Sequence, residues 1–190
     1  AIIILGDAGI NFWLKRGSSD TSNKMKIAVQ PITLLCIQGN HEKRPEPFMG
    51  YELVYKREIG GFAWVEEKYP NIWFLINGVY VINGKKFLIA DGAYSIDKEY
   101  RLTRGVPWFE DEQMSDEDME KLFKICEQKK YFHYVLSHTA PMNYEPTYLF
   151  LPFLYHWLCP CIFYFVHFYL FFLVDKLYNF PFSRKSSLMI

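Results

Sequence analysis

Apolar runs of strand length that end abruptly in polar clusters occur three times along the chain. The runs show no polar alternation, and continuous apolar segments of this kind are typical of strands buried on both faces of a covered sheet. Loops at the carboxyl ends of such strands often carry functional side chains. The three pairs of run and cluster are residues 2–5 with 6–9, residues 32–37 with 38–42, and residues 134–136 with 137–141.

Further short apolar or aromatic segments between these runs are also strand candidates. The dipeptide Asn83-Gly84 separates two of them, and Asn-Gly is typical of a tight β-hairpin. These candidates are residues 61–66, 72–76, 79–82 and 86–90.

A helix is expected to begin near Ser115. This serine is a good N-cap, Asp118 follows three residues later, and acidic side chains suit the first turn. Apolar residues at positions 119, 122, 123 and 126 then share one helical face. Strands that alternate with a helix and hairpins predict an α/β fold.

The composition changes sharply after Glu145. Residues 146–174 contain no Asp, Glu, Lys or Arg and are dense in aromatics. We therefore divide the chain into a domain at 1–147 and a hydrophobic tail at 148–190. The tail has two competing interpretations. It is either a membrane anchor through residues 148–174, which two prolines interrupt, or a non-native product of a frameshift or gene-prediction error. We favour the second, because the composition resembles neither the preceding domain nor an ordinary membrane span.

Length and charge limit the classes of function. A chain of 190 residues is enough for one domain with a hydrophobic core. Lys+Arg and Asp+Glu are both 21, so there is no basic field that would indicate nucleic acid. The four cysteines form no zinc-binding pairs, and no basic segment of a signal peptide precedes the first apolar run. We expect a cytoplasmic protein, membrane-associated if the tail is genuine. The sequence indicates no oligomeric state.

Residues 39–42 (GNHE) are the most specific chemical element. The Asn40 amide oxygen is a neutral ligand for a divalent metal ion, and the imidazole of His41 can donate a proton to a departing alkoxide. Glu42 would either orient that imidazole or be solvated. The alternative for the whole motif is an ordinary turn at the end of a strand.

Asp7 and His138 occupy the corresponding positions after two other apolar runs. A carboxylate can bridge two metal ions, and a histidine can bind one. Taken singly, Asp7 is also a normal turn-capping residue, and a lone histidine is more often packed or hydrogen-bonded than metal-binding. Their common placement with Asn40 is what favours a metal site.

Together, the ordered elements GD at 6–7, GNHE at 39–42 and SHTAP at 137–141 resemble the calcineurin-like metallophosphoesterase superfamily. The runs GNHEKRP, GAYSIDK and WFEDEQ at 39–45, 92–98 and 108–113 are similar to a bacterial and phage branch of it. The resemblance covers residues 1 to about 150.

The resemblance implies a two-sheet β-sandwich flanked by helices, incomplete in this chain, with the site at the strand ends. It implies two divalent metal ions, Mn, Fe or Zn, and a phosphomonoester or phosphodiester substrate attacked in line by a metal-activated hydroxide. By this resemblance Asp7 bridges the metals, Asn40 and His138 bind one of them, and His41 is the general acid.

The chain departs from the family pattern at both ends. The family's Asp-x-His motif would lie before Ala1, and no Gly-His-x-His follows residues 137–141. We therefore read the chain as a fragment and expect it, as written, to bind metal poorly and to hydrolyse little. The alternatives to a hydrolase are a catalytically inactive binding module and a membrane-anchored protein that keeps the fold.

Arg44, Lys98 and Arg101 are candidates for substrate phosphate contacts, since guanidinium groups suit bidentate phosphate binding. Ordinary surface charge is the competing interpretation, and Lys98 has Asp97 beside it as a potential ion-pair partner.

Overall fold

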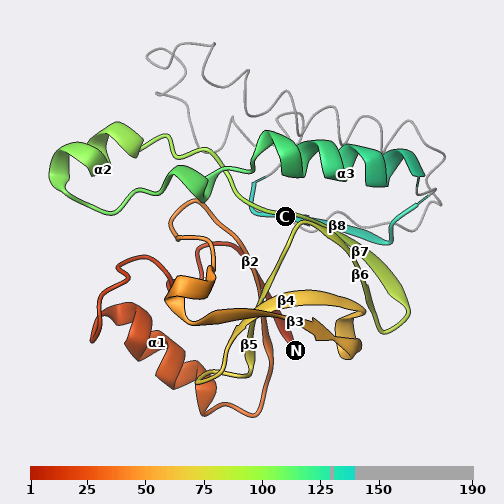
Figure 1. Cartoon of the computed structure of the whole chain (residues 1–190), viewed down its shortest axis with the longest axis horizontal. Helices are drawn as coiled ribbons and strands as arrows, with labels where there is room; N and C mark the ends of the chain where they lie inside the picture. The colour runs from red at the N-terminus through yellow and green to blue at the C-terminus, as the bar shows by residue number, and fades with distance from the viewer. Residues whose placement is uncertain (129–130, 140–190) are drawn as a thin grey trace, which may run out of the picture.

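The computed structural model describes residues 1–128 and 131–139, which form two sheets with helices on their outer faces (Figure 1). The first sheet has the strand order β1-β2-β5-β4-β3 and the second has the order β6-β7-β8. The strands are β1 (Ile2–Leu5), β2 (Leu34–Ile37), β3 (Tyr51–Lys56), β4 (Gly61–Glu66), β5 (Ile72–Leu75), β6 (Gly78–Ile82), β7 (Lys85–Ala90) and β8 (Tyr134–Ser137).

Strand direction determines where the loops gather. β1, β2 and β5 run parallel to one another, and β5, β4 and β3 are antiparallel. In the second sheet β6 and β7 form an antiparallel hairpin, and β8 joins β7 in parallel. Parallel neighbours bring their carboxyl ends to the same edge, so the loops after β1 and β2 lie together.

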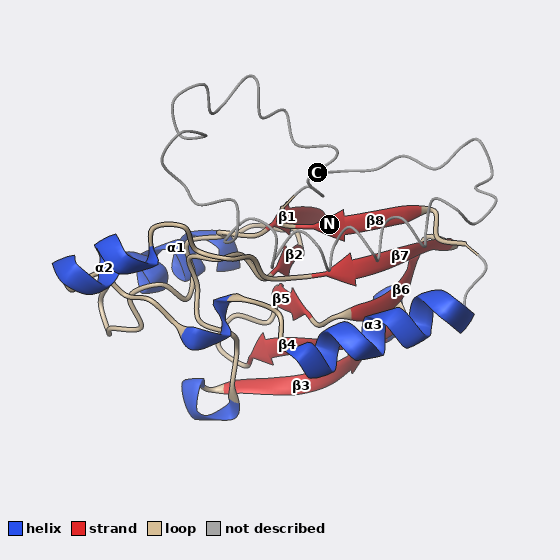
Figure 2. Ribbon diagram, turned by 90° about the horizontal axis from the view of Figure 1, so that it is seen from above, coloured by secondary structure: helices blue, strands red, loops and turns tan. Residues whose placement is uncertain are grey.

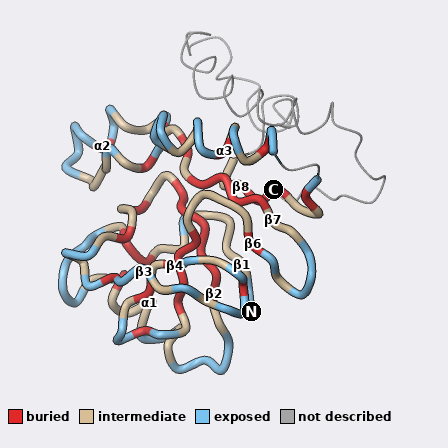
Figure 3. The backbone as a smooth tube through the Cα atoms, turned by 45° about the vertical axis from the view of Figure 1, so that its right-hand side comes forward, coloured by how far each residue is buried: buried red, intermediate tan, exposed pale blue. Residues whose placement is uncertain are grey.

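The two sheets pack face to face, with a shared apolar core between them (Figures 2 and 3). Leu35 and Ile37 of β2 contribute from the first sheet, and Ile89 of β7 and Leu136 of β8 contribute from the second. All four side chains are nearly or fully inaccessible to solvent. Burial of this apolar surface is the main favourable term for docking one sheet on the other.

Helices cover the outer faces of the sandwich. The helix α1 (Ser19–Ala28) packs Ile27 and Ala28 against the outer face of the first sheet. The helix α3 (Asp116–Gln128) buries Leu122 and Cys126 against the second sheet. The short helix α2 (Lys98–Arg104) lies in the connection between β7 and α3. Three single 3-10 turns complete the described elements, at Pro47–Met49, Arg57–Ile59 and Glu110–Glu112.

The fold predicted from the sequence is confirmed: it is a mixed α/β structure with two sheets and flanking helices. Asn83 and Gly84 both have positive φ (49° and 74°), as a tight hairpin turn between β6 and β7 requires. Ser115 caps α3, accepting a hydrogen bond from the backbone N–H of Asp118 at 3.1 Å.

The sequence patterns did not predict β3, α1 or α2. The predicted tail at 148–190 lies outside the described residues. Within the described part of the chain, no helix is both long and apolar enough to cross a bilayer.

Candidate metal and phosphate site

Loops from both sheets meet at one end of the sandwich. Asp7 follows β1 and Asn40 follows β2 in the first sheet, while His138 follows β8 in the second. The His138 Nε2 atom lies 2.9 Å from the Asn40 Oδ1 atom and 3.7 Å from the Asp7 Oδ2 atom. The structure therefore brings together the three side chains that the sequence proposed as metal ligands, although they are up to 131 residues apart in the chain.

The protonation of His138 suits a metal ligand. Its Nδ1 atom lies 2.7 Å from the carbonyl oxygen of Leu5, which can only accept a hydrogen bond, so Nδ1 carries the proton. In the neutral ring, Nε2 then presents a lone pair toward Asn40 Oδ1 and the Asp7 carboxylate. Fixing one imidazole nitrogen through a backbone carbonyl is how proteins orient metal-binding histidines.

The Asn40 side chain is held by Ser95, from the loop after β7. Asn40 Nδ2 donates to Ser95 Oγ at 3.2 Å, which leaves the amide oxygen directed at His138. Ser95 is almost completely buried, so this contact is shielded from solvent. Asn40 is thus oriented by a residue of the second sheet's loops.

These donors fit a divalent cation. Within the described residues no three His, Cys, Asp or Glu side chains are grouped so as to hold a metal ion by themselves. The Asn40 amide is the third donor beside Asp7 and His138. A carboxylate, an amide oxygen and an imidazole nitrogen this close together form a donor set that a divalent cation would satisfy.

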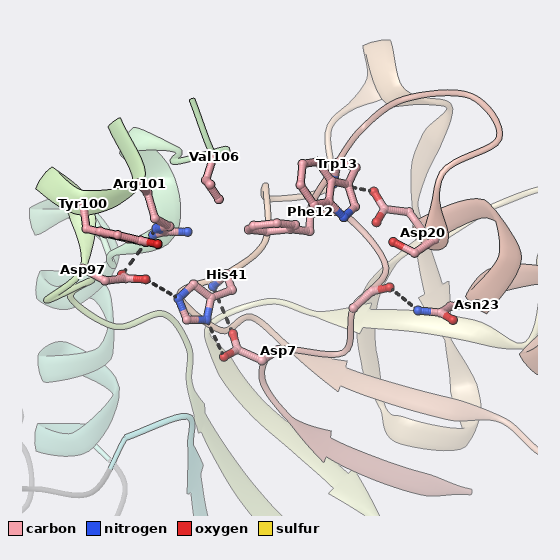
Figure 4. A pocket seen from close by; sticks show the side chains of 12 residues that line it. Asp7, Phe12, Trp13, Asp20, Asn23, His41, Asp97, Tyr100, Arg101 and Val106 are labelled. Atoms are coloured by element: carbon pink, nitrogen blue, oxygen red, sulfur yellow. Dashed lines mark hydrogen bonds and ion pairs between the residues drawn. The ribbon is translucent and has the colours of Figure 1, made fainter. Parts of the chain in front are cut away.

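His41 lies between two carboxylates (Figure 4). Its Nδ1 atom is 3.1 Å from Asp7 Oδ2 and its Nε2 atom is 3.2 Å from Asp97 Oδ2. Its backbone N–H also donates to Asp7 Oδ1 at 3.0 Å. The two carboxylates therefore hold the His41 ring in place from both of its nitrogen atoms.

The neighbouring Glu42 is neither solvated nor in contact with the His41 imidazole, so both interpretations offered from the sequence are wrong. Its side chain is fully buried and accepts a hydrogen bond from the Gly39 N–H at 2.9 Å. Burial, aided by the negative charge of Asp7, raises the pKa of the Glu42 carboxyl to about 7. The backbone N–H groups of Asp7 and Ala8 oppose this rise. Glu42 therefore ties the loop after β1 to the loop after β2.

Two glycines permit the close approach of these loops. A Cβ atom at Gly39 would overlap the carboxylate and backbone nitrogen of Asp7, and one at Gly6 would overlap the His138 ring. Gly6 also has a φ of +96°, and Asp7 itself has a φ of +52°, which Asp tolerates better than most residues. The loop after β1 is thus a tight left-handed turn that directs the Asp7 carboxylate inward.

The three cations proposed as phosphate ligands make other contacts. Arg44 donates from Nη1 and Nη2 to the buried Asp91 carboxylate, both at 2.8 Å, and from Nε to the Asp111 carbonyl at 2.7 Å. Lys98 places its Nζ atom 3.9 Å from the centre of the Trp108 ring. It does not pair with Asp97, which binds His41 and Arg101 instead.

Arg101, the third of these cations, is buried and forms an ion pair with the buried Glu112. It also donates to the carbonyl oxygens of Asn40 and Pro107 at 3.2 and 3.1 Å. A phosphate-binding role for Arg44, Lys98 or Arg101 stays a prediction, and these contacts give all three a structural role.

A pocket of about 480 Å³ opens beside His41. Figure 4 shows Phe12 and Trp13 from the loop after β1 on one side of it, and Asp97, Tyr100 and Arg101 from the start of α2 on the other. Of the residues proposed from the sequence, Asp7, His41 and Arg101 line it, while Arg44 and Lys98 do not.

Two parts of this site could not be predicted from the sequence patterns. Asp97 was not proposed as a partner of His41, because 56 residues separate the two and only the folded chain brings them together. Phe12 and Trp13 lie in a loop without strand or helix periodicity. Their closeness to Asp7 in sequence was the one signal that could have indicated them.

The family model for calcineurin-like phosphoesterases matches residues 1–157. The chain belongs to the calcineurin-like phosphoesterase family. Comparison with curated proteins gave no match, and comparison with solved structures also gave none.

Membership of the calcineurin-like phosphoesterase family confirms the resemblance drawn from the sequence motifs. The family hydrolyses phosphate esters and generally uses two divalent metal ions. The assignment to a bacterial and phage branch stays a prediction. So does the boundary at residue 147, which the match passes by ten residues.

Proposed function

We propose that this chain is a metal-dependent hydrolase of phosphomonoesters or phosphodiesters. The observation that carries the proposal is the convergence of Asp7, Asn40 and His138 beside His41 at the open end of the sandwich. A phosphoesterase needs negative and neutral donors for a cation next to a proton donor, and these four side chains supply both.

In this proposal Asp7, Asn40 and His138 would hold a divalent metal ion. When bound, the ions supply Lewis acidity toward the phosphoryl oxygens and the attacking water. The Leu5 carbonyl keeps the proton of His138 on Nδ1 and so keeps Nε2 available.

His41 is the proposed general acid. Its imidazole faces the pocket between Asp7 and Asp97, where the leaving oxygen of the ester would lie. Asp97 positions the ring, while the Asp7 carboxylate accepts the backbone N–H of His41 and so places His41 beside the proposed metal ligands. Donation of the imidazole proton to the departing oxygen prevents the build-up of an unstable alkoxide.

Metal binding tests the first half of the proposal. We expect Mn²⁺ to bind weakly and turnover to be low, since only three donor side chains converge at the proposed metal position within the described residues. Electron paramagnetic resonance of the free ion follows the binding. Asn40→Ala and His138→Ala should each weaken binding by more than about tenfold, a loss typical even of outer-shell partners. Tyr55→Ala, at an exposed position on β3, is the control and should leave binding unchanged. Absence of Mn²⁺ binding, or equal binding by all four proteins, would refute the proposed site.

Turnover tests the second half. Bis(p-nitrophenyl) phosphate is the substrate, and His41→Ala should abolish Mn²⁺-dependent release of nitrophenolate while Mn²⁺ still binds. A rate that His41→Ala leaves intact would contradict the role given to His41.

A second candidate function rests on one observation. Among the described residues only two ionisable side chains, Asp7 and His138, join Asn40 at the proposed metal position. This small ligand set favours a binding module that keeps the fold without turnover. Mn²⁺ binding together with undetectable hydrolysis by the wild-type chain would support this candidate over the hydrolase.

A further inference from the structure

Three aromatic side chains, Phe12, Trp13 and Tyr100, line the pocket beside His41 and form an aromatic wall. Phe12 and Trp13 line the pocket from the loop after β1, and Tyr100 and Val106 line it from α2 and the segment after it (Figure 4). Trp13 is 40% exposed and Tyr100 is 62% exposed, so both rings reach solvent, although the Arg104 guanidinium carbon lies 5.7 Å from the centre of the Tyr100 ring. Exposed aromatic side chains gathered around one pocket are typical of ligand-binding grooves.

The wall is held in place before any ligand binds. The buried Asp20 carboxylate accepts the backbone N–H groups of Trp13 and Leu14 at 2.7 and 2.9 Å, and Leu14 adopts a positive φ of 55°. Phe12 packs edge-on to Trp13, with ring centres 5.0 Å apart, and edge-on to His41 at 6.3 Å. A fixed aromatic surface binds flat groups at a low cost in entropy.

The acidic side chains that line the pocket disfavour a second phosphate group. Asp7, Asp20 and Asp97 line it, and Arg101 is the one Lys or Arg among its described lining residues. The Arg101 guanidinium is already engaged with Asp97, Glu112 and two backbone carbonyls. A leaving group with additional phosphates would face uncompensated carboxylates, so polyphosphates and nucleic-acid strands are disfavoured.

The position of His41 fixes which part of the substrate meets the wall. A general acid must contact the oxygen that leaves, so the leaving group extends from His41 into the pocket and away from Asn40 and His138, which do not line it. Phe12, Trp13 and Tyr100 are the side chains it then encounters.

Resting on the phosphoesterase function proposed above, we propose that the substrate is a phosphate ester whose leaving group is a flat aromatic group without further phosphates. The group stacks on Trp13 and Tyr100, with its ester oxygen toward His41. Stacking of a planar group on an aromatic side chain contributes about 1–3 kcal/mol per ring, equivalent to about a fivefold to hundredfold gain in affinity.

The experiment measures binding of two non-hydrolysable phosphonates to the full chain in Mn²⁺ by isothermal titration calorimetry. The probes are 1-naphthylmethylphosphonate and ethylphosphonate, which share the phosphonate and differ in the group beyond it. We expect the naphthyl compound to bind at least about tenfold more tightly. Trp13→Ala and Tyr100→Ala should each reduce that ratio to within about threefold while ethylphosphonate affinity stays unchanged. Both side chains are exposed, so the variants should fold, which circular dichroism checks.

The control and the remaining outcomes separate this inference from the proposed function. Tyr55→Ala removes an aromatic side chain of β3 that is 56% exposed and lies outside the residues that line this pocket, and this variant should keep the full ratio. Equal binding of the two phosphonates, or a ratio that survives in the Trp13 and Tyr100 variants, overturns the aromatic inference and leaves the phosphoesterase proposal intact. Failure of both phosphonates and of Mn²⁺ to bind refutes the proposed function and this inference with it. Tight binding of 1-naphthylmethanol, which lacks the phosphonate, also overturns the inference, because the wall would then act independently of the metal site.

Discussion

Replacing Glu42 with glutamine should change how the stability of the metal-free protein depends on pH. The Glu42 carboxyl is fully buried, and its pKa is raised from 4.5 to about 7, chiefly because burial disfavours the charged form. A group whose pKa is higher in the folded state holds its proton there while the unfolded chain releases it. The stability that this provides is complete below about pH 4.5 and is lost as the pH rises toward 7.

The size of the effect follows from the change in pKa. A rise from 4.5 to about 7 corresponds to about 3 kcal/mol, at about 1.4 kcal/mol for each pH unit. Glu42→Gln keeps a neutral side chain of the same shape and an oxygen that can accept the Gly39 N–H. We therefore expect the variant to gain about 3 kcal/mol of stability relative to wild type between pH 4.5 and pH 8.

Urea unfolding followed by tryptophan fluorescence, in EDTA at pH values from 4.5 to 8, measures this difference. Glu52→Gln, at an exposed position on β3, is the matched control and should run parallel to wild type. Added Mn²⁺ should weaken the pH dependence of wild type, since a cation at Asp7 favours ionised Glu42. Parallel stability curves for wild type and Glu42→Gln without metal would refute the reasoning.

Three further changes test the site and its support. Gly39→Ala should lower the free energy of unfolding by about 1–3 kcal/mol and abolish Mn²⁺ binding in titrations. Gly50→Ala, with open space around it, should lower the free energy of unfolding by about 1 kcal/mol because of its positive φ, and should bind Mn²⁺ normally. Asp97→Asn should lower kcat at least about tenfold with little change in KM, because the proposed general acid loses the carboxylate that positions it. The pH profile of kcat should also shift, and an unchanged profile would contradict this role. Arg101→Met should lower the free energy of unfolding in urea by about 3–5 kcal/mol, because the Glu112 carboxylate is left buried without its ion-pair partner. Adding Glu112→Leu to the same chain should recover most of that loss, and no recovery would argue against a stabilising ion pair.

The apolar runs were the most informative part of the sequence. Strands such as β2, with all four residues buried, have no exposed face and so leave an unbroken apolar pattern. The edge strand β3 has exposed positions at Glu52, Leu53 and Tyr55, and its mixed pattern gave no clear signal. The helix α1 has a weak apolar pattern, since its one buried residue is Asp20 and only Ile27 and Ala28 pack on the core. The Asp20 carboxylate accepts hydrogen bonds from the loop before the helix, and no periodic pattern in the sequence indicates such a contact.

The sequence predicted those members of the candidate site that directly follow a buried strand. Asp7, Asn40 and His138 share a position in the topology, so the pattern of the chain alone placed them together. The support around them was not predictable in this way. Glu42 and Arg101 are charged residues whose burial depends on partners far away in sequence or on backbone N–H groups, and charge in a sequence by itself indicates exposure.

The placement of the three proposed ligands on both sheets makes any bound cation a removable cross-link between the halves of the sandwich. Asp7 and Asn40 belong to one half and His138 to the other, so neither half alone can complete the set. An ion that binds only the docked arrangement adds its binding free energy to the docking of the sheets, about 2.7 kcal/mol at a concentration one hundred times its Kd. Removal of the metal ion by a chelator would then weaken the contact between the sheets first at the end that carries the site. The free energy of docking the two sheets would depend on the concentration of the metal ion.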